Sequence, residues 1–182
     1  YSTTGTPKVD RPQVGFTLAK EMPQRRFISY TAQPSVGSDG SVFKIPANDP
    51  KWASPPAEIF FNEDARLVWM MPHMHLRGKD MTYNLEYPTG EKQIVLNVPN
   101  YDFNWQLGYY TDVKIPKGSK MRVDAHFDNS PNNKFNPAPD RPVYWGDQTW
   151  EEMMAPFFGV VVDVKRDPEK VVTVKGGRVR GA

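Results

Sequence analysis

The sequence predicts an all-β protein, an antiparallel two-sheet β-sandwich of jelly-roll type that forms a single domain. Three observations favour this class. Aromatic and β-branched residues gather in short runs, eighteen prolines and thirteen glycines interrupt the chain, and no segment shows the apolar spacing of a helix. Many short strands joined by turns explain all three, and they pack as two antiparallel sheets. A chain of 182 residues buries roughly 70% of its unfolded surface, which is enough for a core.

The chain divides into three parts of this one domain. We expect N-terminal strands and a linker over residues 1–40, the sandwich core over 41–164, and a final strand with a basic tail over 165–182. Turns at 62–65, 88–91 and 115–118 join neighbouring strands, and residues 129–145 are too polar and broken for an element. The tail over 176–180 is expected to be flexible and solvated. The expected strands cover residues 14–19, 26–31, 41–45, 57–61, 66–75, 82–87, 93–98, 104–110, 121–127, 153–164 and 171–174.

The alternation of side chains is clearest over residues 121–127. Successive side chains of a strand point to opposite faces, so this strand should turn one apolar and one polar face. The apolar face holds Met121, Val123, Ala125 and Phe127, and the polar face holds Arg122, Asp124 and His126.

Composition and charge exclude several classes of function. The net charge is only +2, so no field points to a nucleic-acid partner. No apolar run approaches the roughly 20 residues of a membrane span, and no charged start followed by an apolar stretch marks a signal peptide. Without cysteine the chain has no disulfide, no thiolate nucleophile and no blue-copper site. Because it begins with Tyr1, we expect a processed chain or a piece of a longer one.

The stretch around His73 and His75 is the strongest candidate for chemistry, because it holds two of the three histidines in the chain. On an expected strand over 66–75 both side chains lie on one face, with their rings close enough for one metal ion to bridge them. A solvated or hydrogen-bonded histidine pair is the alternative. Gly78 then allows a change of backbone direction.

Further ligands must come from residues distant in the sequence. The candidates are Met153 and its neighbour Met154, of which only one can face a metal while the other packs in the core, and His126. Two imidazoles with a thioether favour copper, whereas zinc prefers thiolate, imidazole and carboxylate. On the polar face, His126 is better suited to support a site through a carboxylate than to ligate.

Two other groups of residues have less specific interpretations. An aromatic set around the expected site is interpreted as sheet packing, and an Asp/Asn cluster is interpreted as turn formers rather than a calcium site. The aromatic set is Tyr101, Phe103, Trp105, Tyr144, Trp145 and Trp150, and the cluster is Asp128, Asn129, Asn132 and Asn133.

The segments HMHLRGK and WGDQTWEEM together resemble the C-terminal domain of the copper type II, ascorbate-dependent monooxygenases, the family of the peptide-amidating and dopamine-hydroxylating enzymes. The resemblance runs from about residue 45 to 162 and implies the same β-sandwich fold. It also implies one copper ion held by His73, His75 and Met153, the Met that directly follows Glu152. Residues 1–5 resemble the link that leaves the family's N-terminal domain.

The chain departs from the family in two ways. The family uses a second copper held by histidines of the N-terminal half, which this chain cannot supply. Met71 stands where the peptide-amidating members have the arginine that anchors a substrate carboxylate. Two hypotheses therefore stay open. One is the oxygen-activating domain of a monooxygenase, a fragment or one subunit that needs a separate copper domain and ascorbate or another reductant. The other is a non-catalytic subunit of an envelope assembly, such as an electron-transfer complex, with vestigial copper ligands.

The expected cellular location follows from the same resemblance to the copper monooxygenases. Family members are disulfide-bonded secreted proteins, so the absence of cysteine suggests a bacterial-type relative. We expect a periplasmic or extracellular protein, either free or peripheral to a membrane.

Overall fold

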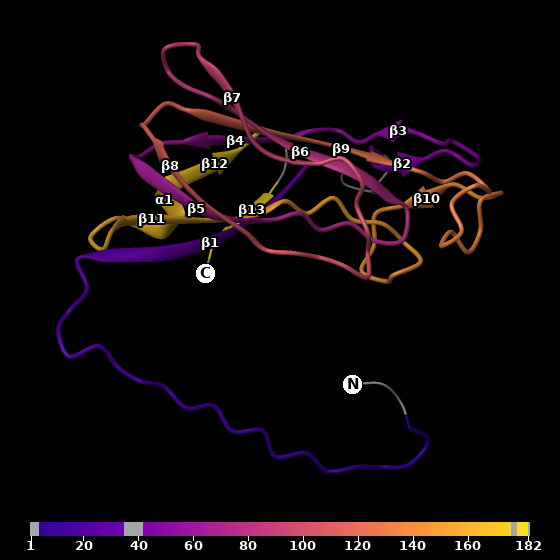
Figure 1. The fold of residues 1–182 in the computed structure, drawn as a ribbon, viewed down its shortest axis with the longest axis horizontal. Helices are drawn as coiled ribbons and strands as arrows, with labels where there is room; N and C mark the ends of the chain where they lie inside the picture. The colour runs from indigo at the N-terminus through magenta and orange to yellow at the C-terminus, as the bar shows by residue number, and fades with distance from the viewer. Residues whose placement is uncertain (1–3, 35–41, 176–177, 182) are drawn as a thin grey trace.

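The structure is a computed structural model that describes residues 4–34, 42–175 and, as backbone, 178–181. The expected all-β antiparallel sandwich is confirmed (Figure 1). The first sheet has the order β13 (Arg178–Gly181), β1 (Arg25–Gln33), β11 (Phe157–Asp163), β5 (Ala65–Met71) and β8 (Tyr109–Ile115). The second has the order β12 (Val172–Val174), β4 (Ala57–Phe61), β9 (Lys120–Phe127), β6 (Gly78–Glu86) and β7 (Lys92–Val98), and β3 (Trp52–Ala53) also pairs with β9.

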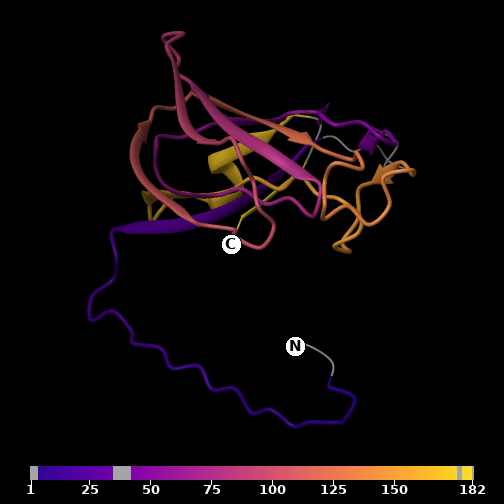
Figure 2. The same cartoon turned by 45° about the vertical axis from the view of Figure 1, so that its right-hand side comes forward.

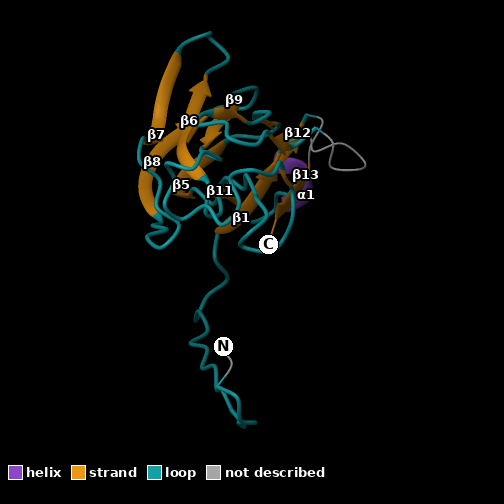
Figure 3. Ribbon diagram, turned by 90° about the vertical axis from the view of Figure 1, so that its right-hand side faces the viewer, coloured by secondary structure: helices purple, strands orange, loops and turns teal. Residues whose placement is uncertain are grey.

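The two sheets face each other across one core. Figure 3 shows β6 and β9 of the second sheet above β5, β11 and β1 of the first. Alternate residues of these strands point inward, as on Ile28 and Tyr30 of β1 and on Val160 of β11, all of which are buried. Tyr30 stacks on Phe158 with ring centroids 5.3 Å apart. In β9 the predicted apolar face is buried and the predicted polar face is not.

Two of the predicted turns are confirmed by their backbone hydrogen bonds. Between β6 and β7, the N–H of Gly90 donates to the carbonyl of Tyr87 at 2.9 Å, and Gly90 has a positive φ of 86°. Between β8 and β9, Ser119 donates to the carbonyl of Pro116 at 3.1 Å and Gly118 has a φ of 88°. A small pair, β2 (Lys44–Ile45) with β10 (Val143–Tyr144), lies at one end of the sandwich.

Several predicted strand boundaries are wrong. Residues 14–19 form no strand, because the segment that precedes β1 lies away from the sandwich in Figures 1 and 2 and finds no neighbour to complete a ladder. The strand expected over 104–110 begins only at Tyr109, and the one expected over 153–164 begins only at Phe157. Residue 41 lies outside the described residues, and β2 starts at Lys44.

The C-terminal region also differs from the expectation. A one-turn helix, α1 (Pro168–Val171), precedes β12, with Asp167 as its N-cap and Pro168 in its first turn. The backbone of residues 178–181 pairs with β1 as β13, so this part of the tail is not a solvated end. No helix in the described part of the chain is long and apolar enough to cross a membrane.

Candidate metal centre

His73 and His75 lie on the connection that crosses from the first sheet to the second. β5 ends at Met71, so the prediction that the strand continues through residue 75 is wrong. Pro72 follows directly and has no N–H to donate to a ladder, which explains the end of the strand. Met74, between the two histidines, is fully buried in the core, and His75 is buried as well.

The two imidazole rings are neighbours, as predicted. Their centroids lie 5.2 Å apart, with an interplanar angle of 83°. Two imidazole nitrogens that share one metal at about 2.0 Å place their ring centroids about 5 Å apart. The observed separation therefore fits two ligands of one ion.

The hydrogen bond of His73 determines which ring nitrogen is available to a metal. Nδ1 of His73 lies 2.6 Å from Oε1 of Gln106. The amide of Gln106 is oriented by its own Nε2, which donates to the carbonyl of Phe103 at 2.9 Å. Because Oε1 can only accept, Nδ1 of His73 must carry the proton in the neutral ring, which leaves the lone pair on Nε2.

His75 has the same arrangement in a more buried place. Its Nδ1 lies 3.2 Å from the backbone carbonyl of Glu151, and only 4% of the residue is exposed. Burial lowers the pKa of His75 below its ordinary value, helped by the charge of His73 and opposed by hydrogen bonds to the carbonyls of Glu151 and Gln148. The neutral ring, which can bind a metal, is therefore favoured.

This shift makes a prediction that NMR can check. The folded state disfavours protonated His75. At a pH just below the ordinary pKa of about 6.5, the folded protein therefore binds fewer protons at His75 than the unfolded protein does. The contribution of His75 to stability is thus present above that value and lost as pH falls below it. We expect the Cε1–H resonance of His75, assigned with a His75→Gln variant, to titrate with a midpoint below about 6.5. A midpoint at or above the ordinary value would contradict the burial argument.

Tyr101 fixes the residue between the two histidines. Its hydroxyl accepts the N–H of Met74 at 3.0 Å and donates to the carbonyl of Met74 at 2.6 Å. The predicted change of direction is present, since the N–H of Gly78 donates to the carbonyl of His75 at 3.2 Å, but φ of Gly78 is not positive. A Cβ there would lie 2.7 Å from both Cβ of Met74 and the ring of Tyr101, so glycine is needed for this close approach.

A second segment, residues 152–155, runs beside the histidines. Glu152 is fully buried, and its carboxylate accepts the N–H of His75 at 2.9 Å and that of Arg77 at 2.6 Å. The N–H of Ala155 donates to the carbonyl of His73 at 2.9 Å. We call residues 73–77 the histidine loop. Met153 therefore lies between two residues, Glu152 and Ala155, that are hydrogen-bonded to the histidine loop.

The two methionines differ in burial. Met154 is 0% exposed and belongs to the core, whereas Met153 is half-buried. Met153 is thus the more accessible thioether of the pair, and Met154 is the one that packs in the core. Among the described residues, no group of three or more His, Cys, Asp or Glu side chains could hold a metal. A site at His73 and His75 therefore depends on a sulfur or external third ligand.

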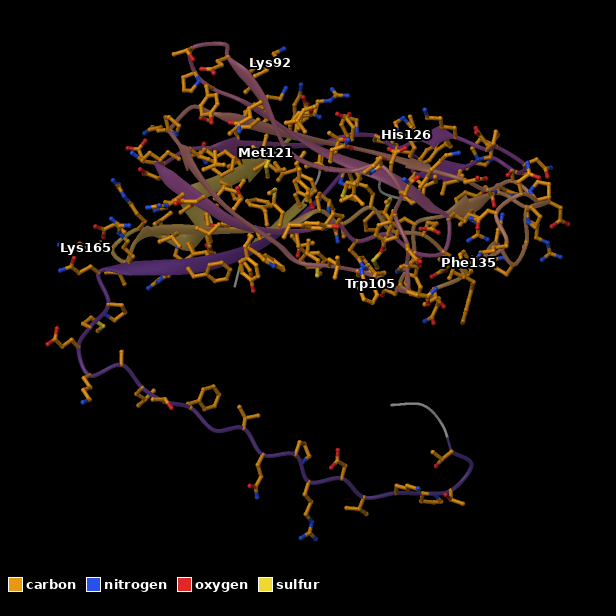
Figure 4. The ribbon with its side chains drawn as sticks, viewed as in Figure 1. Lys92, Trp105, Met121, His126, Phe135 and Lys165 are labelled. Atoms are coloured by element: carbon orange, nitrogen blue, oxygen red, sulfur yellow. The ribbon has the colours of Figure 1, made fainter. Side chains whose placement is uncertain are left out.

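His126 is not part of this arrangement. It lies on β9 opposite Asp80 of β6, and its Nδ1 is 2.6 Å from Oδ1 of Asp80. Figure 4 shows His126 on one side of the sandwich and Trp105, from the segment that contains Gln106, on the other. The structure therefore does not bring His126 together with His73 and His75, and its contact with Asp80 joins β9 to β6.

The Asn-rich segment after β9 has a structural role. Nδ2 of Asn129, a fully buried residue, donates to the carbonyls of Pro46 and Arg141 at 2.8 and 2.9 Å. Nδ2 of Asn133 donates to the carbonyls of Leu76 and Asp128. These amides are engaged in hydrogen bonds within the protein, and Asn133 connects the segment to the carbonyl of Leu76 beside the histidines.

The aromatic set is only partly packed. Trp145 contacts Phe43 edge to face at 5.3 Å, and the ring of Phe103 lies 6.1 Å from that of His75. Trp105, Trp150 and Tyr144 are 70%, 61% and 46% exposed, so interpreting the whole set as sheet packing is wrong for these three. Gln106 and Arg77 contact the site, but the sequence patterns do not single them out. Gln106 shares the aromatic stretch 101–110 with the polar residues Asp102 and Asn104, so the pattern gives no signal for it.

Comparisons with known proteins leave the family open. No family model matches the chain, and no curated protein matches it. Among solved structures, a chain of infectious bursal disease virus Gx strain matches with a TM-score of 0.32 and 10% identity, and one of the Gt strain with 0.21 and 12%. Each match covers 93% of this chain and less than half of the viral chain, 43% and 45% respectively. Likenesses this weak support no inference about function.

Proposed function

We propose that this chain is a copper-binding β-sandwich domain, related to the oxygen-activating domain of the ascorbate-dependent copper monooxygenases. The observation that carries the proposal is the pair of neighbouring imidazoles whose Nδ1 atoms face oxygen acceptors. Nε2 of His73 and Nε2 of His75 would hold the ion, with the thioether of Met153 as the third donor. The domain would act as a fragment or as one subunit of a larger assembly.

The donor set favours copper over other metals. A thioether is a soft ligand that suits Cu(I), and imidazole binds copper in either oxidation state. Zinc sites prefer thiolate, imidazole or carboxylate, and the carboxylate of Glu152 is already bound to backbone N–H groups. Bound copper would supply the redox chemistry by which such monooxygenases activate oxygen.

The protein's own residues would orient the ion and shape its surroundings. Gln106 and the carbonyl of Glu151 hold the ring tautomers, as outer partners of metal-bound histidines commonly do. The rings of Phe103 and Phe157 lie 6.1 Å from those of His75 and His73. Their apolar edges would limit the access of water to this side of the site.

Copper binding is tested most directly by locating the ion. Crystals loaded with Cu(I) without oxygen are expected to show one anomalous peak at the copper edge, bonded to Nε2 of His73 and Nε2 of His75. His73→Ala should abolish the peak, and His126→Ala, the matched control, should keep it. A peak elsewhere, or none, would contradict the proposal.

A second candidate function is a non-catalytic interaction subunit of a periplasmic envelope assembly. The first sheet favours it, because its outer face exposes large apolar side chains, including Phe27 at 53% and Tyr110 at 87%. In that case copper would be absent from the native assembly. Metal analysis of the protein purified from its source would separate the two functions.

A further inference from the structure

Arg77 and Glu152 form a buried ion pair beside the candidate metal centre. The two side chains are 1% and 0% exposed, and Nη1 of Arg77 lies 3.9 Å from Oε1 of Glu152. Burying both charges is costly unless their hydrogen bonds are well satisfied. Fold stability alone does not require such a pair, since apolar residues of similar volume often serve as well.

The contacts of Glu152 connect His75 and Arg77 with the segment that holds Met153. One carboxylate accepts the backbone N–H of His75, the N–H of Arg77 and, next to it in the chain, the N–H of Met153. The histidine loop and the methionine segment are otherwise 75 or more residues apart in the sequence. Glu152 therefore fixes the distance between the imidazole donors and the thioether donor.

The contacts of Arg77 fix this unit to the rest of the domain. Nε of Arg77 donates to Oδ1 of Asn129 at 2.8 Å, and Nη1 donates to the carbonyl of Trp150 at 2.9 Å. Asn129 is itself held by Asn136, whose Nδ2 donates to the same Oδ1 at 2.9 Å. A planar guanidinium can make these diverging bonds at once, which a lysine ammonium on a flexible stem does not reproduce.

We propose that Arg77 and Glu152 are positioning residues that set the geometry of the copper site by holding the histidine loop against the Met153 segment. This inference rests on the proposed function. It predicts that the pair controls copper affinity and the copper–sulfur bond in protein that is fully folded. If the pair were merely structural, substituting it would change the folded fraction but not the copper affinity or the copper–sulfur bond of the protein that is folded.

The test compares copper binding by folded variants. Arg77→Met removes the anchor, and Arg77→Met combined with Glu152→Gln leaves no unpaired buried charge, so the double variant is expected to fold. The carboxamide introduced by Glu152→Gln has one acceptor oxygen instead of two, so at least one of the three backbone N–H groups would lose its partner. Arg122→Met is the matched control, because it breaks the Arg122–Asp124 pair on the second sheet.

We expect Cu(I) affinity, measured by competition with a chromophoric chelator, to fall about 10- to 100-fold in the double variant, as for other outer partners of metal ligands. Copper X-ray absorption should lose the sulfur contribution, and Arg77→Lys should recover part of the affinity. Arg122→Met should behave like the wild type.

Failure of the proposed function and failure of the positioning inference give different results. If wild-type protein binds no copper at His73 and His75, the proposed function fails. If wild-type protein binds copper there and the folded double variant keeps both the affinity and the sulfur contribution, the positioning inference alone is overturned. Circular dichroism and the NMR spectrum of each variant establish that the compared proteins are folded.

Discussion

Met154→Ala is expected to lower the free energy of unfolding by about 2 to 5 kcal/mol, the usual cost of deleting a buried Met side chain. Met154 is fully buried in the core, so its removal loses apolar contacts and leaves a cavity that the sheets can fill only partly. Urea or guanidinium melts of the apoprotein measure this loss. Copper affinity of the folded fraction should change little, because this side chain points into the core.

The neighbouring substitution is its control. Met153→Ala removes a half-buried side chain, so the unfolding free energy should change by much less than for Met154→Ala. Cu(I) affinity should instead fall, because the soft donor is lost. The opposite pattern, with stability lost at Met153 and copper binding lost at Met154, would exchange their assigned roles.

These 182 residues are expected to give no hydroxylated product from copper, ascorbate, oxygen and a glycine-extended peptide above the copper-only background. The copper monooxygenases that the chain resembles in sequence motifs use a second copper centre, and three histidines cannot supply both sites. Met71 also cannot anchor a peptide carboxylate as an arginine does, which removes an interaction of about 1.5 to 3 kcal/mol.

Product analysis by mass spectrometry checks this expectation. Free copper at the same concentration is the background, and a His73→Ala variant shows whether any signal depends on the site. Steady turnover by the wild-type chain, lost in His73→Ala, would mean that one copper suffices. Restoring activity by adding a separate histidine-rich copper domain would support the split-enzyme form of the proposed function.

Sequence reasoning predicted the features that depend on local pattern. Period-two alternation predicted both faces of β9, and proline followed by glycine marked the turn before it. The spacing of His73 and His75 predicted neighbouring rings, and extended backbone delivers this even outside a strand. In each case the determining interactions lie within a few residues, where the chain's own geometry leaves few alternatives.

The two wrong predictions near the ends of the chain share one physical cause. The apolar alternation of residues 14–19 resembles a strand, yet a strand forms only where another offers its hydrogen-bonding edge. The basic tail looked solvated, yet the edge of β1 was free to pair with residues 178–181. Pairing partners are chosen by the topology, which the local pattern does not contain.

For the candidate site, too, the sequence determined one part of the arrangement and the tertiary structure decided the other. The sequence by itself determined the donor types, two imidazoles and a thioether next to an acid, because these are properties of single residues and short spacings. Only the tertiary structure decided that His126 pairs with Asp80, that Gln106 orients His73, and that Glu152 binds the N–H groups of the histidine loop. These contacts join residues 33 to 77 positions apart. The contacts of Gln106 and Glu152 form because the β5–β6 connection, the β7–β8 connection and the segment before β11 meet, and buried polar groups brought together there must satisfy one another.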